Sequence, residues 1–217
     1  MNNLRWLAYL STQFGYEGKE SDDTPTATED LGWLIDLFRK HCPVSTYAHV
    51  FNPGCGAGAE TKLLTDAGYK PIGFTLGAEN VRIGKERYGV TLLEQDMHMP
   101  GFNDNSFDAI FTVQSAEHAL SMHILMLEFW RILRTGGRWF LDTATQNLGM
   151  WQVWHPNLHS HDEWVKFGEV YGFKVAADES IHDRTDLFLE KLPESECVNW
   201  RYTNQIYSAL SKATNGE

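Results

Sequence analysis

Hydrophobic residues between positions 46 and 142 switch repeatedly between two spacings, and this alternation predicts the fold. Short apolar runs with the length of buried strands cover residues 46–52, 70–75, 90–95, 107–113 and 138–143. Between them, apolar residues recur at helical spacing over residues 57–68, 78–89 and 119–134. Strands that alternate with helices predict a parallel sheet covered on both faces, in a doubly wound α/β fold. Its ligand crevice is expected at the carboxyl ends of the strands.

Helical patterns also precede this region. Residues 4–14 form one, and an apolar face of Leu31, Leu34 and Phe38 indicates a second, with Thr28 as its candidate N-cap. After residue 142 we expect an aromatic, histidine-rich loop, then a helix over 161–172, strands over 173–180 and 185–191, and a last helix near 201–210. The expected organisation is an N-terminal helical lid or flank, 1–43, on a single compact domain, 44–217.

Composition narrows the function. The 217 residues are 42% hydrophobic, enough for one full core. A formal net charge of -11 opposes binding to a nucleic-acid backbone, so no nucleic-acid partner is expected. Three widely spaced cysteines indicate a reducing cytosol, and no apolar run reaches the roughly 18 to 20 residues of a membrane span. We therefore expect a cytoplasmic protein without membrane insertion, and the sequence leaves its oligomeric state open.

The stretch VFNPGCGAGAE, residues 50–60, carries the first chemistry. Gly54, Gly56 and Gly58 stand between a strand and a helix, where glycines permit close approach of the backbone and the helix N-terminus offers free N–H groups. A nucleotide-type ligand is the preferred interpretation, and a tight structural turn is the alternative. The GxGxG spacing is not the GxGxxG of dinucleotide sites, and no GxxxxGK[ST] pattern follows.

FNPGCGAG resembles the first motif of the class I S-adenosylmethionine-dependent methyltransferases. Four further stretches follow in that family's order: GFTLGAEN, EQDMHMP, NSFDAIFTVQSAEH and EFWRILRTGGRWFL. The resemblance covers about residues 45–142. It implies a mostly parallel, seven-stranded, Rossmann-like sheet with an antiparallel terminal hairpin, S-adenosylmethionine as cofactor, and S-adenosylhomocysteine as product.

The resemblance also assigns cofactor-binding positions. Asp96 and Met97 fall where the family holds adenine, while Asn52 and Thr75 stand where acids usually meet the methionine amino group and the ribose. GFTLGAEN is similar to a variant found in the cyclopropane fatty acid synthase-like branch, in which an amide at the place of Asn80 serves the ribose. The full set expected at the cofactor is Asn52, Gly54, Cys55, Gly56, Gly58, Thr75, Leu76, Asn80, Asp96, Met97, Val113 and Gln114.

The acceptor is less constrained. The resemblance places Glu117 and His118 beside the transferred methyl group as candidate catalytic residues, with helix capping as the alternative for His118. No metal site is expected, because His155, His159 and His161 lack a third ligand at matching spacing. We expect a small-molecule acceptor, a lipid, isoprenoid, polyketide or natural product with an amine, hydroxyl or carbon nucleophile. A non-catalytic accessory protein and, less favoured, a nicotinamide-dependent oxidoreductase remain as alternatives.

Overall fold

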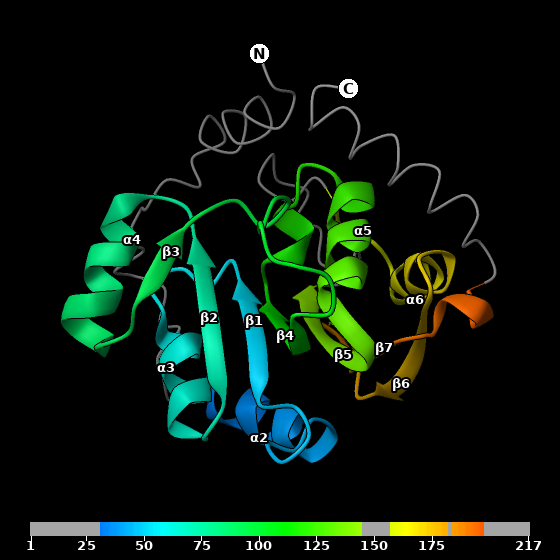
Figure 1. The fold of residues 1–217 in the computed structure, drawn as a ribbon, viewed down its shortest axis with the longest axis horizontal. Coiled ribbons are helices and arrows are strands. Elements are labelled where there is room, and N and C mark those ends of the chain that lie inside the picture. The colour runs from blue at the N-terminus through cyan, green and yellow to red at the C-terminus, as the bar shows by residue number, and fades with distance from the viewer. Residues whose placement is uncertain (1–30, 145–156, 182–183, 198–217) are drawn as a thin grey trace.

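A seven-stranded sheet forms the centre of the computed structural model, which describes residues 31–144, 157–181 and 184–197 (Figure 1). The strands are β1 (His49–Pro53), β2 (Lys70–Thr75), β3 (Leu92–Glu94), β4 (Phe107–Val113), β5 (Leu133–Ala144), β6 (Phe173–Asp178) and β7 (Arg184–Lys191). The helices are α2 (Gly32–His41), α3 (Ala59–Asp66), α4 (Ala78–Ile83), α5 (Met122–Ile132) and α6 (His161–Val170). Shorter turns are η1 (Gly84–Tyr88, a π-helical turn), η2 (Ala116–His118) and η4 (Glu194–Glu196).

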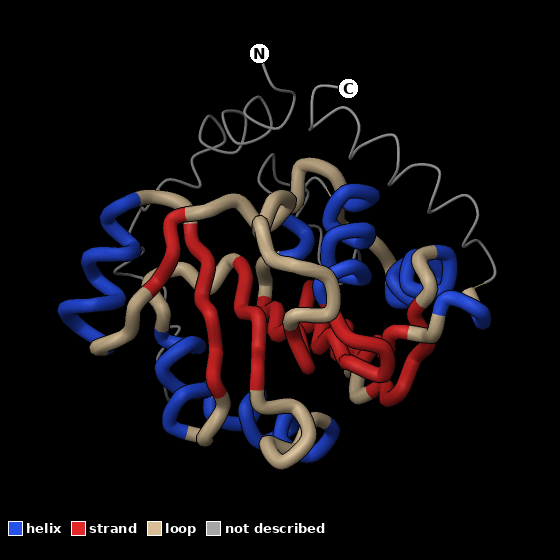
Figure 2. Tube along the Cα trace, viewed as in Figure 1, coloured by secondary structure: helices blue, strands red, loops and turns tan. Residues whose placement is uncertain are grey.

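The strand order is β3-β2-β1-β4-β5-β7-β6 (Figure 2). β1 pairs in parallel with β2 and β4, and β7 pairs antiparallel with both β5 and β6. Central strands that are apolar on both faces, such as β4, become buried on both sides when helices cover the sheet. The predicted doubly wound, mostly parallel sheet and its antiparallel terminal hairpin are confirmed.

Two helical layers cover the sheet. On one face, α5 and α6 pack around Phe129 and Trp139. On the other face, Phe38 of α2 lies with its ring centroid 5.0 Å from that of Phe111 and 6.0 Å from that of Phe140. The part of the expected lid that the structure describes, α2, is thus a core layer, because its apolar face is buried against the sheet. Residues 1–30, including Thr28, lie outside the described residues.

Residues 135–137, between the expected helix over 119–134 and the expected strand over 138–143, read in sequence as a turn (TGG) but form a bulge inside β5. Leu133 already pairs with Phe107 of β4, and regular pairing resumes only with Arg138 opposite Ala109. Gly136 takes a positive φ of 72° within the extra residues. The prediction of a separate turn before the strand was wrong, because the strand forms its first pair before the glycines.

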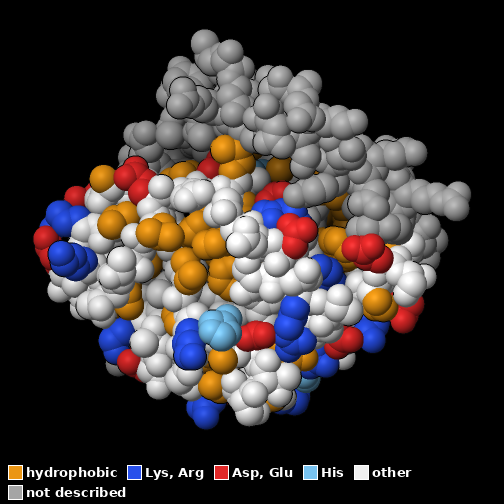
Figure 3. Space-filling view, in the orientation of Figure 1, with side chains coloured by type: hydrophobic (Ala, Val, Ile, Leu, Met, Phe, Trp, Pro, Cys, Tyr) orange, Lys and Arg blue, Asp and Glu red, His pale blue; other side chains and the backbone are white. Residues whose placement is uncertain are grey.

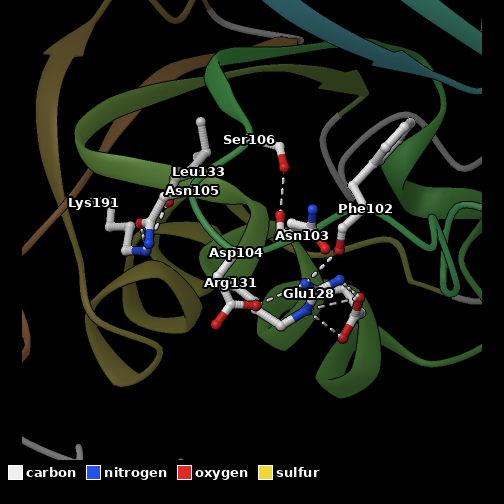
Figure 4. A network of polar contacts seen from close by, with 9 residues as sticks. All are labelled: Phe102, Asn103, Asp104, Asn105, Ser106, Glu128, Arg131, Leu133 and Lys191. Atoms are coloured by element: carbon white, nitrogen blue, oxygen red, sulfur yellow. Dashed lines mark hydrogen bonds and ion pairs between the residues drawn. The ribbon is translucent and has the colours of Figure 1, made fainter.

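A polar network joins the elements at the edge opposite the carboxyl ends of the parallel strands (Figure 4). The buried Lys191 donates to Asn105 Oδ1 at 3.0 Å and to the Leu133 carbonyl at 2.7 Å, and its Nζ lies 4.0 Å from the Trp130 ring centroid. Burial lowers the pKa of Lys191 to about 8. Arg131 ties the preceding loop to α5 through Phe102 and two carboxylates.

Charges of both signs are interspersed on the face shown in Figure 3, and lysines and arginines form no continuous stripe there. Across the described residues, no helix combines the length and the hydropathy that crossing a membrane requires.

Candidate functional site

A pocket opens where the loops after β1, β2, β3 and β4 meet, at the carboxyl ends of these parallel strands. Its cavity volume is about 230 Å³. The residues that line it are Gly54, Gly56, Thr75, Leu76, Asn80, Gln95, Asp96, Met97, His98, Gln114, Ser115 and His118.

The glycine loop forms one wall. Gly54 has a φ of 72° and packs on the loop after β4, so a Cβ at this position would lie only 2.6 Å from Ser115 Cβ. Gly56, with a φ of 51°, has no neighbouring atom within 4 Å of the position a Cβ would take. The Cys55 N–H donates to the Phe74 carbonyl at 3.0 Å. The loop is therefore fixed to the sheet while its backbone at Gly56 faces the pocket.

Asn52 lies outside the pocket lining and is fully buried. Its Nδ2 donates to Glu60 Oε2 at 2.9 Å and to the Phe111 carbonyl at 3.1 Å, and its Oδ1 accepts from Thr61 Oγ1 at 2.8 Å. Burial raises the pKa of Glu60 to about 7. The side-chain amide of Asn52 thus joins β1 to α3 and β4.

The end of β2 contributes polar groups to the pocket. Asn80 Nδ2 donates to Thr75 Oγ1 at 3.1 Å and to the Leu76 carbonyl at 3.2 Å, and all three residues line the pocket. Glu79 does not line it and bonds to Arg82 on the surface of α4. Of these two neighbouring residues of α4, only Asn80 therefore faces the pocket.

The loop after β3 brings a buried acid and a buried histidine together. Asp96 Oδ1 accepts from the His98 backbone N–H at 2.9 Å and lies 2.5 Å from His98 Nδ1. His98 Nε2 accepts from the Ser121 N–H at 3.2 Å, at the start of α5. Asp96, Met97 and His98 all line the pocket. The Asp-x-His spacing after a strand is the signal that could have identified His98 in the sequence.

Gln114 follows β4 in a left-handed conformation, with a φ of 45°. Its Nε2 donates to Asp142 Oδ1 at 2.8 Å on the neighbouring strand. Burial and the adjacent Asp186 raise the pKa of Asp142 to about 8, and Arg184 bonds both carboxylates. The side chain of Gln114 is thus held at the pocket by a buried acid pair.

Glu117 and His118 are neighbours in η2 but differ in position. His118 lines the pocket, whereas Glu117 is fully buried and does not. Neither carboxylate oxygen of Glu117 makes a hydrogen bond of ordinary geometry within the described residues, and the nearby Thr143 side chain only partly offsets the effect of burial on its pKa. Burial raises the pKa of Glu117 to about 7. Burying a carboxyl group that makes so few hydrogen bonds within the described part of the chain costs free energy, which marks Glu117 as a residue that packing alone does not explain.

The structure gathers most of the expected residues around one pocket, and five stand apart. The expected residues outside the lining are Asn52, Cys55, Gly58, Val113 and Glu117. The lining residues that sequence reasoning missed are Gln95, His98 and Ser115. Cys55 is buried and its Sγ donates to the Phe74 carbonyl. Within the described residues no cluster of three His, Cys, Asp or Glu side chains could hold a metal, and His155 lies outside them.

Residues 51–141 match the family model described as "Methyltransferase domain". The chain is 25% identical over 146 residues to the O-methyltransferase cnsE of Penicillium expansum, covering 58% of this chain and 52% of that protein. It is 27% identical over 144 residues to the methyltransferase GfsG of Streptomyces halstedii, covering 62% of this chain and 51% of that protein. The chain spans about half the length of these curated relatives.

A solved structure shares the fold. It is the Burkholderia thailandensis 1,6-didemethyltoxoflavin-N1-methyltransferase, solved with 1,6-didemethyltoxoflavin and S-adenosylhomocysteine bound. The TM-score is 0.67 at 14% identity, over 87% of this chain and 90% of that one.

Proposed function

We propose that this chain is a class I S-adenosylmethionine-dependent methyltransferase that transfers a methyl group to a small-molecule acceptor, because residues 51–141 match a methyltransferase domain and its curated relatives are methyltransferases. The observation that carries the proposal is the pocket at the carboxyl ends of the strands. The exposed backbone of Gly56, the polar side chain of Asn80 and the carboxyl group of Asp96 line this one space.

The lining residues suit the parts of this cofactor. Asp96 accepts from the adenine amino group while Met97 packs on the base. Thr75 and Asn80 supply a hydroxyl and an amide for the ribose hydroxyls. The backbone at Gly54 and Gly56 faces the methionine end. Leu76 and Gln114 complete this lining. The residues outside the lining that belong to the glycine loop and the strand ends beside it are Asn52, Cys55, Gly58 and Val113.

When bound, S-adenosylmethionine supplies an electrophilic methyl group on a sulfonium. Transfer of this methyl group from sulfur to an acceptor oxygen, nitrogen or carbon would be an in-line displacement, so the residues around the pocket would have to orient the acceptor. His118 lines the pocket and takes the acceptor proton. Glu117 lies outside this lining, so its buried carboxyl group acts on the acceptor only indirectly, through the neighbouring His118 of η2.

The acceptor is proposed to be a hydroxyl- or amine-bearing molecule with an apolar body. The O-methyltransferase relative supports a hydroxyl acceptor, and the N1-methyltransferase with a related fold supports a nitrogen. Polyketide, isoprenoid and lipid scaffolds fit this description, and the site of action is proposed to be the cytoplasm.

Calorimetric titration of the full chain with S-adenosylhomocysteine tests the cofactor site. We expect binding that Asp96→Asn weakens by about tenfold or more, because a hydrogen bond to a charged group is worth about 1.5–3 kcal/mol. Asp66→Asn is the matched control, since Asp66 is exposed on α3 away from the pocket. Absence of binding would favour an accessory protein without turnover. Binding of NADH in its place would indicate an oxidoreductase.

A further inference from the structure

His98 makes bonds in two directions from a buried position in the pocket wall. His98 is 2% exposed. Its Nδ1 bonds Asp96 on the same loop, and its Nε2 accepts from the backbone N–H of Ser121 at the start of α5. Ser121 is also the N-cap of α5, where its Oγ accepts from the Ile124 N–H at 3.4 Å. The imidazole therefore connects the loop after β3 with the first turn of α5.

These contacts decide which ring nitrogen carries the proton. A backbone N–H can only donate, so the Ser121 N–H requires Nε2 of His98 to be an unprotonated acceptor. A neutral imidazole then carries its proton on Nδ1. That proton lies on the 2.5 Å contact with Asp96 Oδ1. The main chain of α5 thus fixes the tautomer that donates to the acid.

The geometry points to His98 as a positioning residue that orients the Asp96 carboxylate for recognition of the adenine amino group. The backbone N–H and the ring Nδ1–H of His98 both act on Asp96 Oδ1, at 2.9 and 2.5 Å, and two donors on one oxygen restrict rotation of the carboxylate. This inference rests on the proposed function, because it takes Asp96 as the adenine contact.

A histidine that merely fills the core would not need this arrangement. Phe or Leu could occupy a buried position without hydrogen bonds, whereas His98 lines the pocket beside Asp96 and Met97 and makes a hydrogen bond with each ring nitrogen. The two interpretations differ in one measurable property. A packing role affects stability, while a positioning role affects the preference for the 6-amino group of the purine.

The test compares S-adenosylhomocysteine with S-inosylhomocysteine, which carries an oxygen in place of the 6-amino group. Dissociation constants are measured by calorimetry for the wild type, His98→Asn, His98→Gln and His98→Leu. An Asn amide can take the place of Nδ1 and keep a donor to Asp96, whereas a Gln amide reaches toward Ser121 and Leu offers neither bond.

We expect the wild type to prefer S-adenosylhomocysteine, His98→Asn to keep the preference, and His98→Leu and His98→Gln to lose about tenfold of it. Equal preference in the wild type and His98→Leu would overturn the inference. If His98→Leu does not fold, His98→Asn and His98→Gln decide, and equal preference in these two would also overturn it. Failure of the wild type to bind S-adenosylhomocysteine at all would instead overturn the proposed function.

Nitrogen NMR of the histidine rings provides a second readout. A proton on Nδ1 of His98 supports the inference, and a proton on Nε2 alone would contradict it, because that tautomer cannot accept from Ser121. This measurement needs no ligand, so its result is independent of the proposed function.

Discussion

Replacing Asn52 by aspartate should destabilise the protein strongly at alkaline pH, even though an acid at this position is common in the family. Asn52 is fully buried, and its Nδ2 donates to Glu60 Oε2 and to the Phe111 carbonyl. In Asn52→Asp an oxygen replaces this nitrogen and faces two acceptors. The bond from Thr61 to the other side-chain oxygen can remain.

The expected cost follows from the two donated bonds. Losing a donor to a partly buried carboxylate and a donor to a buried carbonyl gives a destabilisation of about 3–5 kcal/mol when both carboxyl groups are ionised. Burial already raises the pKa of Glu60 to about 7, so at acidic pH a proton shared by the two acids restores one bond. The cost should therefore fall to about 1–2 kcal/mol near pH 5 and be largest near pH 8.

Urea unfolding followed by circular dichroism at these two pH values measures the effect. Asn103→Asp is the matched control, because Asn103 is exposed and this substitution adds the same negative charge at a solvent-accessible position. Asn52→Asp/Glu60→Gln should recover most of the loss, because an amide at 60 can donate to the new carboxylate. The reasoning is refuted if Asn52→Asp is as stable as Asn103→Asp near pH 8, or if its deficit shrinks as the pH rises.

Three further changes probe other parts of the molecule. Burial lowers the pKa of Lys191 to about 8 in the folded protein, so above this pH the unfolded chain holds the lysine proton more tightly than the folded one. The free energy of unfolding of the wild type, relative to that of Lys191→Met, should therefore rise by up to about 3 kcal/mol between about pH 8 and 10.5. Urea midpoints across that range check this, and a constant difference would contradict it. Glu117→Gln should leave the affinity for S-adenosylhomocysteine unchanged and lower turnover by about 100-fold in a methyl-transfer assay. Unchanged turnover would show that Glu117 has no role in catalysis. Ser160→Ala removes the capping box with Glu163 and should cost about 1 kcal/mol, seen as a lower melting temperature with unchanged ligand affinity. A melting temperature equal to that of the wild type would show that the cap contributes nothing.

The fold was predictable because its central strands are almost wholly apolar. β2 and β4 begin and end where the sequence pattern places them, and β4 is buried at every position but one because helices cover both faces. The bulge in β5 was not predictable. Glycines in sequence indicate freedom of the backbone, but only pairing with β4 shows that the strand has already begun at Leu133.

The site was predictable at the level of loops and less so at the level of side chains. Asn52 stands at the end of β1, but its direction depends on Glu60 and Thr61, which the first turn of α3 brings to it. Glu117 and His118 are adjacent in sequence, yet only His118 lines the pocket because η2 turns them to different sides. Local sequence identifies the strand end, and packing decides which side chain faces the ligand.

The close contact between Gly54 and Ser115 has a consequence for how a ligand arrives. The loop after β1 packs on the loop after β4, and Ser115 Oγ donates to the Pro53 carbonyl at 3.3 Å while the Cys55 N–H holds the loop to β2. This wall of the pocket is pre-formed, so little backbone entropy is lost there on association. Affinity differences among cofactor analogues that meet this wall should accordingly appear in their dissociation rates, while their association rates stay nearly constant.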